Sequence, residues 1–256
     1  MSHQSGPHSQ GSFHMKTTSV HCLKAAALIA TLLGTMTMVQ AGTGAEQTVP
    51  SPLKAMEIDF EARAVAKADL GYFRFVPGQV APVHHHLAPA IGLVSSGRII
   101  YQAEGEQARI LDEGEAFYEP AGPSILRFDN MSATEPAVFI DFSLQREGEP
   151  FIALDEEPAQ PIDRTSLPSL DLGGRTFGHV DVYSRTLPAS ASVELSATEP
   201  LIGIVAEGVV ELRLDGGETT RLVEGNTFAL IEDGASAELR NGSSDVDARL
   251  VTYHLR

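Results

Sequence analysis

Residues 90–119 read AIGLVSSGRIIYQAEGEQARILDEGEAFYE, and residues 201–230 read LIGIVAEGVVELRLDGGETTRLVEGNTFAL. The two stretches align without a gap at an offset of 111 residues, and in both of them glycine-containing turns separate short apolar runs. Matching glycines are expected where a tight turn needs a positive φ, which glycine adopts without strain. This pattern predicts a duplicated unit that is built from short strands.

The duplication extends outward to residues 74–144 and 185–255, with sixteen identical pairs at the same offset. Within the first copy the alternating apolar runs predict six strands, over residues 90–94, 98–103, 108–111, 116–119, 124–128 and 137–142. No helical period is convincing in residues 73–144. Regularly spaced short strands with such turns are typical of jelly rolls and small β-barrels, so we expect an all-β chain with two tandem barrels.

Composition sets the expected boundaries of the two barrels. We assign residues 56–144 to the first barrel and residues 167–256 to the second. Residues 145–166 are acidic and contain three prolines, which is typical of a linker. Residues 42–55 are expected to be a flexible N-terminus of the mature protein.

The N-terminal region has the pattern of a secretory signal peptide over residues 15–41. Lys16 and Lys24 flank the start of a short apolar run, and Val39-Gln40-Ala41 places small residues at a cleavage site. The pattern predicts a periplasmic or secreted protein, and a retained membrane anchor is the alternative. Residues 1–14 are polar, and we interpret them as an extension or as a start assigned too far upstream.

Charge and composition restrict the expected partners. Without Lys16 and Lys24 the 18 basic residues become 16, against 34 acidic residues, so the mature chain carries a net charge of −18. This charge disfavours nucleic acid and an anionic membrane as partners. Cys22, the only cysteine, lies in the leader, and the absence of tryptophan disfavours stacking on sugars. A small molecule remains as the expected ligand, and a homodimer is compatible with such barrels.

Two groups of residues in the first copy resemble the motifs of the cupin superfamily. The first group follows the spacing of the first cupin motif: Gly78, His84, His86 and Gly97. The second follows that of the second motif: Gly114, Pro120-Ala121-Gly122 and Asn130. Residues 114–137, GEAFYEPAGPSILRFDNMSATEPA, are especially similar to small bacterial cupins. The resemblance implies a secreted bacterial bicupin, and for the second copy it depends mainly on the repeat.

The resemblance also implies a metal site, from which this chain departs. Metal-binding cupins hold a divalent metal with two histidines and a glutamate from the first motif and a histidine from the second. Ala90 stands where that glutamate is expected, and Ile125 stands where the second-motif histidine is expected. In the second copy Leu195 and Ala197 replace the motif histidines, so we expect that barrel to lack metal ligands. We interpret His254 as structural.

Glu119 is a candidate replacement for the missing carboxylate. Phe117 has Phe228 as its identical counterpart, which suggests that position 117 faces the core. Glu119 lies two residues further on the same face, where the second copy has Leu230. An acid in a position that its duplicate fills with leucine is costly unless it is paired or binds a metal.

Together, His84, His86 and Glu119 would form a set of two histidines and one carboxylate, which suits Fe(II), Mn(II) or Zn(II). His84 and His86 point to one face of a strand and His85 to the other, so we expect His85 to face solvent. Two alternatives stay open. Glu119 could precede Pro120 at a strand end with its carboxylate in water, and the histidines could be a hydrogen-bonded vestige without metal.

Two functions are therefore compatible with the sequence, and no catalytic residue is assigned. The resemblance implies metal-dependent chemistry of the dioxygenase, isomerase or lyase type on a small molecule. The alternative is a non-catalytic bicupin that binds a small ligand or has a structural role.

Overall fold

The computed structural model describes residues 48–256. The predicted extension over residues 1–14, the signal peptide over 15–41 and the start of the predicted flexible segment lie outside the described residues. The described chain contains eighteen β-strands and no helix, so it has no helix that could cross a membrane. The predicted all-β fold is confirmed.

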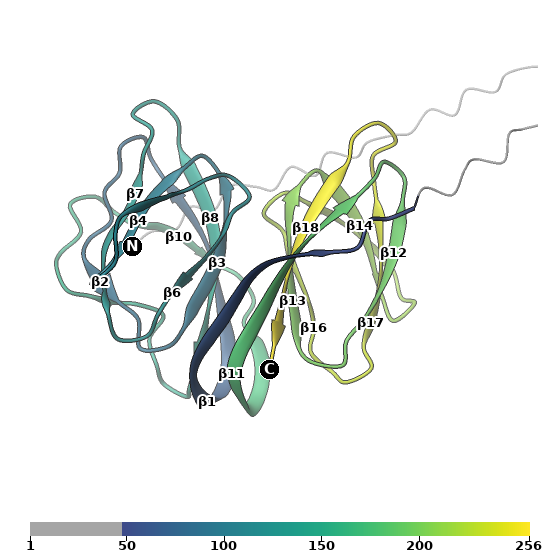
Figure 1. Ribbon diagram of the computed structural model, residues 1–256, viewed down its shortest axis with the longest axis horizontal. Helices are drawn as coiled ribbons and strands as arrows, with labels where there is room; N and C mark the ends of the chain where they lie inside the picture. Colours follow the sequence, from purple (N-terminus) through teal and green to yellow (C-terminus); the bar gives the residue numbers. More distant parts are fainter. Residues whose placement is uncertain (1–47) are drawn as a thin grey trace, which may run out of the picture. The chain divides into compact units, whose positions relative to one another are not determined.

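Each copy of the repeat forms an antiparallel barrel with one wall in a large shared sheet and another in a small sheet of its own (Figure 1). All six strands predicted in the first copy are present: β3 (Ala90–Ser96), β4 (Ile99–Ala103), β5 (Arg109–Leu111), β6 (Ala116–Glu119), β7 (Ser124–Asn130) and β8 (Ala137–Gln145). Their counterparts in the second copy are β13 (Leu201–Glu207), β14 (Val209–Leu214), β15 (Thr219–Val223), β16 (Thr227–Leu230), β17 (Ser236–Asn241) and β18 (Ala248–Leu255). The small sheets have the orders β5-β4-β7-β2-β9 and β12-β17-β14-β15, with β2 at His84–His85, β9 at Ala153–Leu154 and β12 at Ser192–Ser196.

Two long strands join the copies. β1 (Leu53–Phe75) pairs with β11 (Leu170–Leu187) over most of its length and with β8 over its last residues, while β11 also pairs with β18. The resulting nine-stranded sheet has the order β16-β13-β18-β11-β1-β8-β3-β6, and β10 (Asp163–Ser166) pairs with β1. The pairing of β1 with β11 contains register shifts, which bend and twist a strand. The boundary expected at residue 56 is therefore not a break, because β1 already begins at Leu53.

The segment 145–166, predicted to be a linker, connects the copies but also belongs to the first barrel. Its strand β9 pairs with β2, and its strand β10 pairs with β1. Phe151 and Ile162 pack against the core of the first barrel. The segment is acidic overall, so its composition did not indicate that these two apolar residues would be buried. Their burial holds the segment against the first barrel.

Three apolar cores support this arrangement. The first barrel is filled largely by phenylalanines, and the second by smaller aliphatic residues. A third core lies between the two barrels, where the rings of Phe142 and Tyr253 meet edge to face at 5.2 Å. The Tyr253 hydroxyl also donates a hydrogen bond of 2.8 Å to the Gly92 carbonyl, which links β18 to β3. The copies are thus packed on each other as well as joined by a sheet.

Candidate metal centre

The histidine tripeptide lies on a strand that directs alternate rings inward. His84 pairs with Ile125 of β7 and with Leu154 of β9. His84 is 5% exposed and His86 is 1% exposed. His85 is partly exposed and contacts the Asp155 carboxylate at 2.7 Å. The alternation of a strand thus places two imidazoles inside the first barrel and the third at its surface.

Glu119 meets these imidazoles from the opposite wall. It lies at the end of β6, is 3% exposed and pairs across the sheet with Ala90. The alternative in which its carboxylate lies in water is therefore wrong. Because Glu119 is the direct cross-strand neighbour of Ala90, its carboxylate enters the barrel beside the position where the cupin motif has its glutamate.

Backbone carbonyls orient both rings. Nδ1 of His84 lies 2.8 Å from the Pro82 carbonyl oxygen, and Nδ1 of His86 lies 3.1 Å from the Phe151 carbonyl oxygen. A ring that donates its Nδ1–H to a carbonyl presents Nε2 as the other functional atom. Metal-binding histidines commonly have such a partner on the second ring nitrogen. The two Nε2 atoms are thus directed at Glu119.

The spacing of the donor atoms fits a metal ion better than direct hydrogen bonds. Nε2 of His84 lies 3.7 Å from Oε1 of Glu119, and Nε2 of His86 lies 3.3 Å from Oε2. The ligand atoms of all three residues lie within 4.8 Å of one another. A metal bound at about 2.1 Å by each ligand separates neighbouring ligand atoms by roughly 3.0–3.4 Å. Within the described residues, Nε2 of His86 and Oε1 of Glu119 have no hydrogen-bond partner. The three side chains therefore fit a divalent metal.

Burial and the attraction between the carboxylate and the imidazoles have opposite effects on the pKa values of these three side chains. Burial is the largest single influence on each imidazole and lowers its pKa, but the Glu119 carboxylate outweighs it, so that the pKa values of His84 and His86 lie above 6.5. Burial acts to raise the pKa of Glu119, yet the two imidazoles hold that pKa at about 2. In the metal-free protein the cluster is thus an ionised carboxylate beside rings that hold protons tightly.

Asp141 is a fourth polar side chain at the site, and our sequence analysis missed it. It lines the same cavity from β8, is fully enclosed, and its Oδ1 atom has no hydrogen-bond partner within the described residues. Burial and the neighbouring Glu119 charge raise the pKa of Asp141 well above its usual value, which favours the protonated carboxyl. The sequence did contain an indication that Asp141 belongs to the site. Asp141 is a charged residue flanked by apolar ones, and its counterpart in the second copy is the uncharged Thr252.

The cavity around the cluster is small and mostly apolar. Its volume is about 30 Å³, and each enclosed water molecule needs on the order of 10–15 Å³ of such space. Aromatic and aliphatic side chains form most of the lining: Phe73, Phe75, Phe128, Phe139, Phe151, Ile152 and Ile162. Besides the side chains of His84, His86 and Glu119, the cavity thus has room for about two or three water-sized groups.

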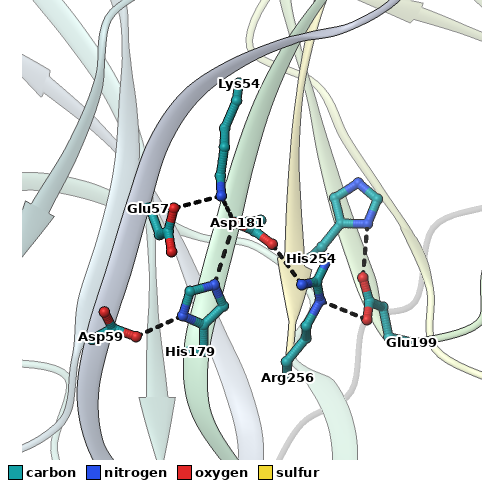
Figure 2. Close-up of polar contacts among 8 residues, drawn as sticks. All are labelled: Lys54, Glu57, Asp59, His179, Asp181, Glu199, His254 and Arg256. Carbon is teal, nitrogen blue, oxygen red and sulfur yellow. Dashed lines mark hydrogen bonds and ion pairs between the residues drawn. The ribbon is translucent and has the colours of Figure 1, made fainter.

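A second group with ligand-type side chains lies on β1 and β11, where Glu57 and Asp59 face His179 (Figure 2). Nδ1 of His179 lies 2.7 Å from Asp59 and Nε2 lies 3.3 Å from Asp181. The Asp59 carboxylate raises the pKa of His179, which favours a charged ring that donates from both nitrogens. Glu57 and Asp59 are exposed, and Glu57, Asp59 and His179 already pair with charged neighbours, so we interpret this group as an ion-pair network.

Comparisons with known proteins agree with the fold. Residues 71–143 match the cupin domain family. The chain is similar in structure to AerE from Microcystis aeruginosa, with a TM-score of 0.54 and 16% identity over 81% of this chain and 98% of that one. It is also similar to a salicylate 1,2-dioxygenase from Pseudaminobacter salicylatoxidans, with a TM-score of 0.52 and 14% identity over 74% of this chain and 71% of that one. No curated protein sequence matches the chain.

The match to the cupin domain family covers both motifs of the first barrel, which the sequence had indicated by resemblance. At such low identities the similarity to the two solved structures shows the fold alone.

Proposed function

We propose that this protein is an exported bicupin whose first barrel binds one divalent metal through His84, His86 and Glu119 and uses it to bind a small molecule. One observation carries the proposal. Three buried donor atoms converge from two walls of the barrel, and two of them have no hydrogen-bond partner within the described residues. A buried polar atom without a partner costs about 1–3 kcal/mol, and a cation at this point contacts all three side chains.

The ligand set indicates the class of metal and of chemistry. Two imidazoles and one carboxylate suit Fe(II), Mn(II) or Zn(II), and a metal so held supplies a Lewis acid with coordination positions left for a small ligand. The surrounding phenylalanines exclude water and strengthen every charge interaction in the cavity. Asp141 lines the cavity, and its raised pKa favours the protonated form, which can donate a hydrogen bond there. These features support chemistry of the dioxygenase, isomerase or lyase type.

The volume of the cavity favours a second candidate, a non-catalytic barrel that binds only the metal or a very small ligand. Pockets for drug-sized ligands have volumes of roughly 300–1,000 Å³, far above the 30 Å³ here. A substrate of several carbon atoms needs a displacement of lining residues such as Phe151 and Ile152. The size of the accepted ligand therefore separates the two candidates.

Metal content tests the proposal. The protein is purified after export, and its metals are measured by mass spectrometry beside a triple variant, His84→Leu/His86→Ala/Glu119→Leu, which carries the residues of the second barrel at these positions. We expect about one equivalent of metal in the wild type and none in the triple variant. His85→Ala is the matched control, because it removes the outward imidazole of the same tripeptide. Wild-type protein that stays metal-free after incubation with Fe(II), Mn(II) and Zn(II) would refute the proposal.

Export is a separate part of the proposal and is supported by the pattern of residues 15–41. We expect the mature protein in the periplasm or medium, cleaved after Ala41. N-terminal sequencing of the exported protein tests this point, and a cytoplasmic protein that retains Lys16 would refute it.

A further inference from the structure

The second barrel has a cavity at the place that corresponds to the metal cluster of the first. Strand pairing establishes the correspondence, since Glu119 pairs with Ala90 in the first barrel and Leu230 pairs with Leu201 in the second. By the same register the metal-binding side chains are replaced by apolar ones: Leu195, Ala197 and Leu230. This end of the second barrel therefore has no metal ligands of the kind found in the first.

The cavity of the second barrel is nevertheless much the larger of the two. Its volume is about 400 Å³. One inward position differs between the barrels and contributes to the larger volume. In the first barrel Phe73 pairs with Phe139, and in the second Arg185 pairs with Leu250, the counterpart of Phe139. Arg185 therefore takes the place of Phe73. The polar side chains of the lining come from three segments: Tyr183, Arg185, Ser196, Thr198, Glu199, Thr252, His254 and Arg256. The cavity thus has the size and the mixed lining of a small-molecule pocket.

Arg185 is the exceptional side chain of this cavity. Four arginines of the described chain are buried or partly buried, namely Arg63, Arg164, Arg185 and Arg249. Three of them bind carboxylates: Arg63 binds Glu149, Arg164 binds Asp69 and Arg249 binds Glu207. The side chain of Arg185, alone among these four, makes no hydrogen bond or ion pair with any residue that the structure describes. Its guanidinium is open to the cavity and free to bind an acceptor, so its position points to an anionic ligand.

The other charges around the cavity are already matched (Figure 2). Arg256 lies 2.8 Å from both Asp181 and Glu199, and Lys54 lies 2.7 Å from Asp181. Glu199 also contacts His254 at 3.4 Å, and burial lowers the pKa of that histidine, so it is neutral at pH 7. Both carboxylates of this network already have cationic partners, whereas the side chain of Arg185 forms no ion pair within the described residues.

We propose that the second barrel binds a small organic monocarboxylate, with the carboxylate on the guanidinium of Arg185. A guanidinium holds a carboxylate through two parallel hydrogen bonds. Tyr183 and Thr252 line the same cavity and supply hydroxyl groups, while Leu195 and Ala197 supply an apolar surface for the body of the ligand. A single guanidinium without an ion pair, in a cavity that the Glu199 carboxylate also lines, favours a monoanion over a phosphate dianion. The site is independent of the metal cluster.

Ligand-detected NMR with benzoate, acetate and uncharged benzamide tests the proposal on the full mature protein. We expect benzoate to bind at least tenfold more tightly than benzamide, and Arg185→Gln to weaken benzoate binding by at least about tenfold, the usual loss for a charged hydrogen bond. Arg221→Gln is the matched control, since it removes an exposed positive charge from β15 of the same barrel. The triple variant of the first barrel should also retain binding.

Four outcomes would overturn the proposal. Benzoate and benzamide could bind alike, which would mean that the carboxylate is not recognised. Arg185→Gln could leave benzoate affinity unchanged, or the triple variant could lose it, and either result would place the ligand elsewhere. Failure of both benzoate and acetate to bind at millimolar concentration would likewise reject a monocarboxylate site. Thermal unfolding of each variant verifies that it is folded.

Discussion

Zinc binding to the metal-free protein at pH 6.5 should release about one proton, and Glu119→Gln should abolish most of that release. In the wild type the Glu119 carboxylate holds the pKa values of His84 and His86 above 6.5, so at this pH each ring is more than half protonated. Mutual repulsion of the rings limits the total to roughly one proton. A metal ligand must be a neutral imidazole, so binding expels this proton.

The variant isolates the contribution of the carboxylate. With glutamine at position 119 the charge is gone but burial remains, and burial lowers both imidazole pKa values. Both rings are then largely neutral at pH 6.5, so zinc binding releases few protons. Glu119 itself contributes no proton, because its pKa is about 2. The affinity for zinc should still fall by at least about tenfold, since a charged ligand is lost.

Isothermal titration calorimetry in buffers of different ionisation enthalpy measures the number of protons released. This number is the slope of the observed binding enthalpy plotted against the ionisation enthalpy of the buffer. His85→Ala should behave as the wild type. Equal slopes for the wild type and Glu119→Gln, or a wild-type slope near zero, would refute the inference that Glu119 holds a proton on the rings.

Three further results are expected for the metal-free protein. Asp141→Asn should raise the free energy of unfolding at pH 7 in urea denaturation, because burial penalises the charged form of Asp141 and asparagine carries no charge; a less stable variant would contradict this reason. Tyr253→Phe should lower the same free energy by about 1–2 kcal/mol, since the 2.8 Å hydrogen bond to the Gly92 carbonyl is lost; unchanged stability would show that this bond contributes nothing. The melting temperature should be highest between about pH 4.5 and pH 6.5. The lowered pKa of Glu119 gives stability that is present above 4.5 and lost as the pH falls towards 2, whereas the raised imidazole pKa values give stability that is present below 6.5 and lost as the pH rises. A profile of the triple variant with the same maximum would refute this assignment.

The strands of the first copy were predictable because each is a local pattern closed by a turn. β1 and β11 were not predicted, because they lie almost entirely outside the repeat and pair with each other across more than a hundred residues of sequence. Such long-range pairing depends on tertiary packing and leaves little trace in local alternation. For the same reason the strands in the predicted linker were not foreseen, because β9 and β10 form only by pairing with strands of the first barrel.

The metal cluster was predictable from strand alternation and from the comparison of Glu119 with Leu230. The cavity of the second barrel was not. At an offset of 111 residues Arg185 aligns with the exposed Arg74, which makes it look like a surface residue. The strand pairing instead places Arg185 where the first barrel has Phe73. A shift of one residue in a strand exchanges its two faces, so the sequence alignment concealed an inward arginine.

The long strand β1 makes the two copies inseparable. A chain divided within residues 145–166 would leave one fragment with Leu53–Ala68 unpaired, and the other with the matching edge of β11 open. Exposed edges of this length associate readily with other chains, so neither fragment is a usable domain on its own. The duplicated chain is thus one cooperative unit, so a mutation that destabilises either barrel will destabilise the whole molecule.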